Sequence, residues 1–290
     1  MDQATLLWTL ASTFFAGLAL FLQKIVAEEG RNAALFAMIS YGLAGILAVI
    51  VLLTLSDVPP EWKLISAFGI AAGTIHGLSN FTRIESLKYI DSVLYFPIHK
   101  VLGPLLVVIG GVVFFVEPLT ILQYIGIALS LSVPLLLITS VERHRQKNLS
   151  LGLKLLIVSA VLSAASLLLS KQGVMYSSAV ILFLVTSQIA GSAASAGILI
   201  KQRGFRYSSF LHADQRDIYL SALSGIFSFL SSLSLFMALS TGFVSIVYVI
   251  QAHYILIPIV LSVWWYKDHI NLRKLSAVVV SFLAITLLAL

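Results

Sequence analysis

Cysteine is absent from this sequence, which excludes disulfide bonds, thiolate metal sites and cysteine nucleophiles. Charge is also scarce: Asp, Glu, Lys and Arg make up 10% of the 290 residues, whereas hydrophobic residues make up 59%. The connections between the apolar runs are too short for a soluble domain, so catalysis in an extramembrane domain is excluded. These shortages leave one class, an integral membrane protein.

The apolar runs are about 20 residues long, which suits helices crossing a hydrocarbon core about 30 Å thick. Strands of a membrane barrel would instead show shorter segments of alternating polarity. The sequence therefore predicts an all-α integral membrane protein with ten transmembrane helices. The expected spans are 4–26, 33–55, 64–87, 93–116, 119–140, 152–170, 178–200, 218–239, 243–265 and 272–290.

Lysine and arginine gather in the connectors that follow odd-numbered spans, for example Arg143, Arg145 and Lys147 after the fifth. Basic connectors stay in the cytoplasm, so both termini are expected outside a bacterial cytoplasmic membrane that the chain crosses many times. The net charge of +6 thus indicates orientation and not a nucleic-acid partner. Oligomeric state leaves no signal in the sequence.

The two halves of the chain resemble each other, which predicts two five-helix repeats, residues 1–141 and 142–290. Repeats with an odd number of spans enter the membrane from opposite sides, and such inverted repeats are typical of transporters with a site near the midplane. The matched pairs are Ser12 with Ser159, Lys24 with Lys171, Ser92 with Ser245, Tyr95 with Tyr248, and Glu117 with Asp268.

A short motif opens the fifth span: Glu117-Pro118-Leu119-Thr120, followed by Gln123 and Gly126. It resembles the pattern of EamA-type members of the drug/metabolite transporter superfamily, and Asp268-His269-Ile270-Asn271 with Ala277 resembles a degenerate second copy. The resemblance implies ten helices in a basket, with the third, fourth, eighth and ninth around a substrate cavity. It leaves the substrate open. Family members usually keep both termini in the cytoplasm, against the expectation from the loop charges.

The third span carries a polar stripe, His76, Asn80 and Arg83, on one helical face. Ionisable residues within a membrane are costly and point to function. Two alternatives stay open: Arg83 could extend to the membrane surface, and His76 could be a neutral histidine bonded to Asn80. Glycines four residues apart, at 69, 73 and 77, indicate close helix packing.

The fourth span adds Tyr95, His99 and Lys100. Lys100 could pair with Glu85, the one carboxylate well inside a span, but Arg83 would still leave a fixed positive charge in need of an anion. A substrate carboxylate or phosphate would supply that anion.

The ninth span repeats this face with less charge, through Tyr248 and Gln251. His253 lies two residues further on and is expected to point largely away from Gln251. Serines spaced along the sixth and eighth spans are read mainly as packing residues, with Ser228 and Ser232 opposite His76 and Asn80 in the repeat alignment.

These features together predict a secondary transporter that works by alternating access on a small polar metabolite with an anionic group, such as an amino acid, organic acid or sugar phosphate. A membrane-embedded enzyme acting on a lipid-linked substrate is the alternative, although no motif supplies its catalytic groups. No cofactor or metal is expected, and proton coupling stays open. The expected substrate-binding residues are His76, Asn80, Arg83, Tyr95, His99, Lys100, Tyr248 and Gln251.

Overall fold

The computed structural model describes residues 1–29, 33–55, 59–87, 89–90, 92–137, 148–175, 180–203, 214–258, 260–261 and 272–290. Within these residues the regular structure is entirely helical. The elements are α1 (Gln3–Glu28), α2 (Ala33–Leu55), α3 (Trp62–Leu87), α4 (Ser92–Phe114), α5 (Ile121–Leu136), α6 (Leu149–Val174), α7 (Val180–Arg203), α9 (Gln215–Thr241), α10 (Val244–Gln251), the 3-10 turn η3 (Ala252–Ile255) and α12 (Leu272–Ala289).

Most predicted spans coincide with one helix, and several helices extend a few residues beyond the apolar run. The ninth span was predicted as one helix and is interrupted instead: α10 ends at Gln251 and gives way to η3. Pro258 follows, and its ring excludes the carbonyl of Tyr254 from regular α-helical bonding, which accounts for a tighter turn just before it. The second copy of the EamA motif, residues 268–271, lies outside the described residues.

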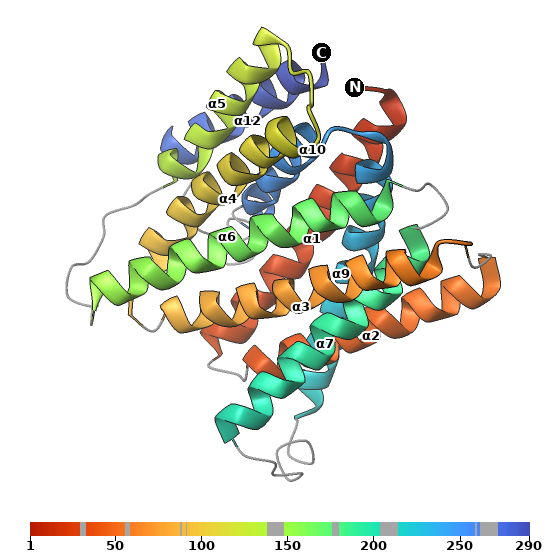
Figure 1. Cartoon of the computed structure of the whole chain (residues 1–290). Helices are drawn as coiled ribbons and strands as arrows, with labels where there is room; N and C mark the ends of the chain where they lie inside the picture. Colours follow the sequence, from red (N-terminus) through yellow and green to blue (C-terminus); the bar gives the residue numbers. More distant parts are fainter. Residues whose placement is uncertain are drawn as a thin grey trace.

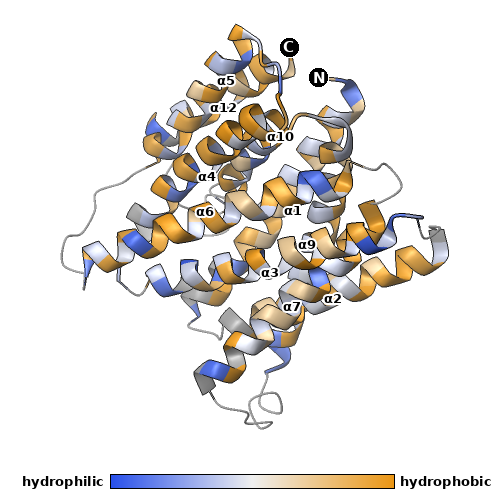
Figure 2. Ribbon diagram, viewed as in Figure 1, coloured by the Kyte–Doolittle hydropathy of each residue, from blue (hydrophilic) through white to orange (hydrophobic). Residues whose placement is uncertain are grey.

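The described chain contains seven helices that are long and apolar enough to cross a membrane, plus three shorter apolar segments at 121–136, 244–258 and 275–289. Large apolar side chains such as Phe114, Ile121 and Phe282 are more than two-thirds exposed on the outer surface. Hydrophobic colours cover most helix surfaces in Figure 2, and hydrophilic colours gather near helix ends. An outer surface of this kind suits lipid, so the protein is an integral, multi-pass membrane protein.

The helices pack across the two halves of the chain more than within them (Figure 1). Helix α3 packs on α6 and α7, α9 packs on α1 and α2, α2 packs on α7, and α5 packs on α12. Both termini lie at one end of the molecule, where the amino group of Met1 donates a hydrogen bond to the carbonyl of Ala289 at 3.2 Å.

The glycines of α3 confirm the predicted close packing. A side chain at Gly73 would overlap the backbone of Ser187, and one at Gly77 would overlap Ala194, both on α7. Glycine therefore lets the two backbones touch, as small residues do between membrane helices. This contact fixes the position of the polar face of α3.

Candidate substrate cavity

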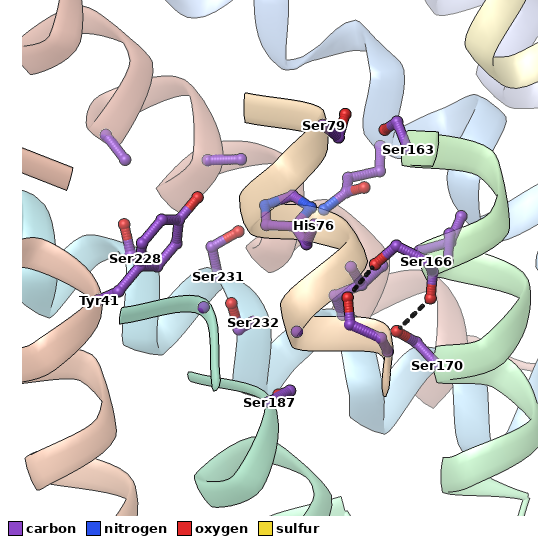
Figure 3. Close-up of a pocket in the computed structure, with 18 of the residues that line it drawn as sticks. Tyr41, His76, Ser79, Ser163, Ser166, Ser170, Ser187, Ser228, Ser231 and Ser232 are labelled. Atoms are coloured by element: carbon purple, nitrogen blue, oxygen red, sulfur yellow. Dashed lines mark hydrogen bonds between the residues drawn. The ribbon is translucent and has the colours of Figure 1, made fainter. Parts of the chain in front are cut away.

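A cavity of about 240 Å³ lies at the centre of the helix bundle. Helices α1, α3, α4, α6, α7, α9 and α10 and the turn η3 all contribute to its wall, with Tyr41 from α2. Figure 3 shows His76 between Tyr41 on one side and Ser163 and Ser166 on the other. A volume of this size accommodates a small metabolite.

Six of the eight predicted residues line this cavity: His76, Arg83, His99, Lys100, Tyr248 and Gln251. None of the described residues in the lining is acidic. Lys100 was also considered as a partner of Glu85, and the hydrogen bond that the structure gives it goes to the hydroxyl of Tyr254. Its ammonium nitrogen lies 3.9 Å from the centre of that ring, within the range of a cation–π contact.

The other two predicted residues, Asn80 and Tyr95, lie behind the lining. Asn80 donates a hydrogen bond to the hydroxyl of Tyr41, which itself faces the cavity. Tyr95 is fully buried and stacks on His99 with ring centres 5.3 Å apart. Both residues therefore support lining side chains, although sequence spacing alone placed them in the lining itself.

A hydrogen-bonded triad of Ser79, Ser159 and His99 joins α3, α6 and α4 beside the cavity. Ser79 donates to the carbonyl of Ser159 at 2.8 Å, and Ser159 donates to the carbonyl of Ser79 at 3.0 Å. The hydroxyl of Ser159 also lies 3.4 Å from Nε2 of His99 and accepts a 3.0 Å bond from the hydroxyl of Tyr95.

A second triad of Ser231, Ser12 and Gln251 joins α9, α1 and α10 in the same way. Ser231 donates to the carbonyl of Ser12 at 3.1 Å, and the two hydroxyls lie 3.4 Å apart. The side-chain amide of Gln251 donates to the hydroxyl of Ser12 at 2.9 Å. Ser231 and Ser12 stand at the positions that the repeat alignment assigns opposite Ser79 and Ser159, and Gln251 lies within one residue of the position opposite His99.

The serine stripes divide between packing and lining. Ser221 and Ser224 of α9 are buried away from the cavity, whereas Ser228, Ser231 and Ser232 line it. Sequence reasoning missed several polar residues of the lining, among them Gln23, Tyr41, Ser79, Ser187, Gln188 and Ser231. The one signal available for them was polarity within an apolar run, which an interhelical hydrogen bond explains equally well.

Lys171 of α6 directly follows the lining residue Ser170. Its ammonium group is buried and donates to the carbonyls of Leu239 at 2.6 Å and Gly242 at 2.8 Å. These carbonyls belong to the carboxyl end of α9, where a positive charge is favourable.

Glu117 holds the next segment of the same turn. Its carboxylate is buried and accepts hydrogen bonds from the backbone N–H groups of Val244, at 2.5 Å, and Ser245, at 3.1 Å, which begin α10. Val116, just before it, has a φ of 51°, a conformation that costs a non-glycine residue energy. Lys171 on α6 and Glu117 in the α4–α5 connection thus both hold the α9–α10 turn, and we call this pair the clamp.

Fold and cavity together define a helical membrane protein with a polar chamber enclosed by both halves of its chain. Residues 150–290 match the model of the EamA-like transporter family. This match confirms, for residues 150–290, the EamA-type resemblance read from the sequence, and the family that it identifies is one of membrane transporters.

Comparison with solved structures agrees on the fold. Of 29 matching chains, one, described as "Crystal structure of protein", superposes with a TM-score of 0.78 over 99% of this chain and 96% of that chain, at 13% sequence identity. Identity this low carries the fold alone. A search of curated proteins found no match.

Proposed function

We propose that this protein is a secondary transporter of a small polar metabolite with an anionic group, such as an amino acid, an organic acid or a sugar phosphate. It moves this solute across a bacterial cytoplasmic membrane by alternating access between two inverted repeats. The charge of the central cavity carries the proposal.

Two basic side chains, Arg83 and Lys100, face the cavity, and none of its described lining residues is acidic. A buried cation without a nearby counter-charge is costly, so an anion that enters the cavity is stabilised there. Arg83 presents a planar pair of donors that suits a carboxylate or phosphate, while Lys100 acts as a point charge. His76 and His99 add hydrogen-bonding groups on the same side.

The packing of the helices supports alternating access. When the halves are exchanged, the contact of α3 with α6 corresponds to that of α9 with α1, and the contact of α3 with α7 corresponds to that of α9 with α2. The two serine triads correspond in the same way. A chain built so has two nearly equivalent arrangements, each closed toward one side of the membrane.

In this proposal the clamp closes the cavity on the side of the termini. It ties α6 and the α4–α5 connection to the α9–α10 turn at the end of the molecule where the termini lie. The repeat alignment pairs Lys171 with Lys24 and Glu117 with Asp268, which predicts an equivalent clamp at the opposite end when the protein closes there.

Counterflow in liposomes tests the transport function directly. Purified protein should exchange radiolabelled for unlabelled L-glutamate, succinate or glucose 6-phosphate without consuming either, and Arg83→Ala and Lys100→Met should each weaken exchange of the anion at least tenfold. Unchanged exchange in both variants would contradict the anion assignment. Chemical conversion of the solute would favour the enzyme alternative.

The absence of cysteine makes alternating access testable without background labelling. Single variants Ser170→Cys, near the clamp, and Gln23→Cys, near the other end of the cavity, should react with a membrane-impermeant maleimide from opposite sides. Saturating substrate should change the two labelling rates in opposite directions. Rates that rise or fall together would contradict alternation.

A further inference from the structure

A second cavity of about 10 Å³ lies beside the main one, between α4, α5 and the junction of α10 with η3. Its volume is close to that of one water molecule, which excludes the transported solute. Lys100 lines both cavities and therefore forms the partition between them. The remaining walls are mostly apolar, including Pro104, Leu131, Val133, Pro134 and Ile255.

His253 presents an unsatisfied nitrogen in this lining. Its Nδ1 lies 3.0 Å from the carbonyl of Val249 and 3.1 Å from that of Ile250, and because carbonyls only accept, Nδ1 carries the hydrogen. Nε2 is therefore the acceptor of the neutral ring. It is buried and has no hydrogen-bond partner.

Ser130 of α5 repeats this situation in the same lining, since its buried hydroxyl also lacks a partner. Buried polar atoms without partners are rare and costly, and a bound water is the usual remedy. Two such atoms around a water-sized space indicate a site that holds a small polar ligand. Lys100 and the lack of a carboxylate among the described lining residues disfavour a metal cation there.

We propose that this chamber, formed by His253, Ser130 and Lys100, is the binding site for a coupling proton. A water held between Ser130 and His253 relays a proton that arrives from the aqueous side: one O–H bond of the water breaks as an N–H bond forms at Nε2, and the incoming proton restores the water. The ring becomes an imidazolium ion with one added positive charge. This inference rests on the proposed transport of an anion, and it makes the protein an anion–proton symporter.

Coupling follows from the position of Lys100. An imidazolium at His253 places a second positive charge behind the ammonium group that faces the substrate, so a bound anion favours protonation and protonation favours the anion. The titratable group that faces His253 from α4 is Lys100, and η3 itself contributes Tyr254, which accepts from Lys100. Helix α5 presents Ser130 and apolar residues. Acidification should therefore raise anion affinity.

Proton uptake on ligand binding tests the site. The anion that binds best among L-glutamate, succinate and glucose 6-phosphate is titrated calorimetrically in two buffers of different ionisation enthalpy. Wild-type protein should take up close to one proton per anion near pH 7, and His253→Gln should take up almost none while still binding the anion.

Ser130→Val provides a second variant that keeps His253 in place. Its methyl groups fill the water-sized space, so proton uptake should fall there too, with a melting temperature near that of wild type. Proton uptake that persists in both variants would overturn the proposal, as would uptake lost instead in His76→Gln or His99→Gln. Counterflow of an anion without any proton uptake would refute this site alone, whereas absence of anion counterflow would refute the proposed function.

Discussion

The two serine triads beside the cavity share one part and differ in another. In each triad two serines on different helices bond to each other, and we call this pair the frame. The third residue, which bonds to one of these serines, differs between the triads, and we call it the tip. Ser79 with Ser159 and Ser231 with Ser12 bind each other through equivalent hydroxyl–carbonyl bonds. At the tip, the first triad carries His99, and the second carries Gln251. The serine–serine bonds are thus alike in the two triads while the third residue differs, and under the proposed function this third residue contacts the solute.

The two halves of the chain also differ in the charge of the residues that they place around the cavity. His76 and Arg83 of the first half are basic, and the positions that correspond to them in the second half hold Ser228 and Leu235; His253, which corresponds to Lys100, lines the small second cavity. Under the proposed function, the similar helix contacts of the two halves serve alternation between two states, and the difference in charge between the two walls serves recognition of an asymmetric solute.

Arg83→Ala should have the largest effect on recognition. Loss of a charge-assisted hydrogen bond costs roughly 1.5–3 kcal/mol, which corresponds to anion binding weakened about 10- to 100-fold. Leu235→Ala, at the corresponding position of the other half, should change affinity less than about threefold. Isothermal titration with both variants measures the contrast, and equal losses would show that the two walls do not differ.

Gly73→Ala should have the next largest effect, on stability. An added methyl would overlap the backbone of Ser187, which cannot yield as a side chain can, so the cost should be about 1–3 kcal/mol. Gly225 occupies the corresponding place on α9, where the added methyl would lie 3.0 Å from Leu43 and from the carbonyl of Ser40. Gly225→Ala should therefore lower the melting temperature less.

Gly197→Ala on α7 is the control, because its added methyl would meet nothing within 4 Å. Alanine favours a helix over glycine, so this variant should melt at or slightly above the wild-type temperature. A melting temperature for Gly73→Ala that matches this control would contradict the tight crossing of α3 and α7.

The fold was largely predictable from the sequence because the membrane constrains it. Every span must be helical and about 20 residues long, so hydropathy located the helices and the fold class. The break between α10 and η3 escaped prediction, since a proline inside a membrane span is compatible with a continuous kinked helix as well as with a turn. The serine pairings also needed the structure, because polarity alone does not select a partner on another helix.

The cavity was predictable where charge marked it. Ionisable residues such as Arg83 and Lys100 are rare within membranes, which made them stand out. Tyr95 was placed in the lining because it shares a face with His99, yet its ring packs behind that histidine. Neutral residues such as Gln188 carry no comparable signal.

His99→Gln should have a smaller effect than loss of Arg83, because it converts the tip of the first triad into that of the second. A glutamine amide can reach the hydroxyl of Ser159, so anion affinity should fall no more than about threefold. His99→Leu removes the polar tip and leaves Ser159 without that contact, and affinity should fall about tenfold. Similar affinities for the two variants would show that the tip does not contact the solute.

The smallest effects should come from the equivalent tyrosines Tyr95 and Tyr248. Tyr95→Phe removes a buried hydrogen bond to Ser159, so unfolding free energy should fall by about 1 kcal/mol while anion affinity stays within about twofold. Tyr248→Phe, in the lining, should leave the melting temperature unchanged and weaken binding two- to threefold. Thermal unfolding measures the first effect and titration the second. If Tyr95→Phe instead weakened binding and Tyr248→Phe lowered stability, Tyr95 would lie in the lining and Tyr248 would support the helix packing.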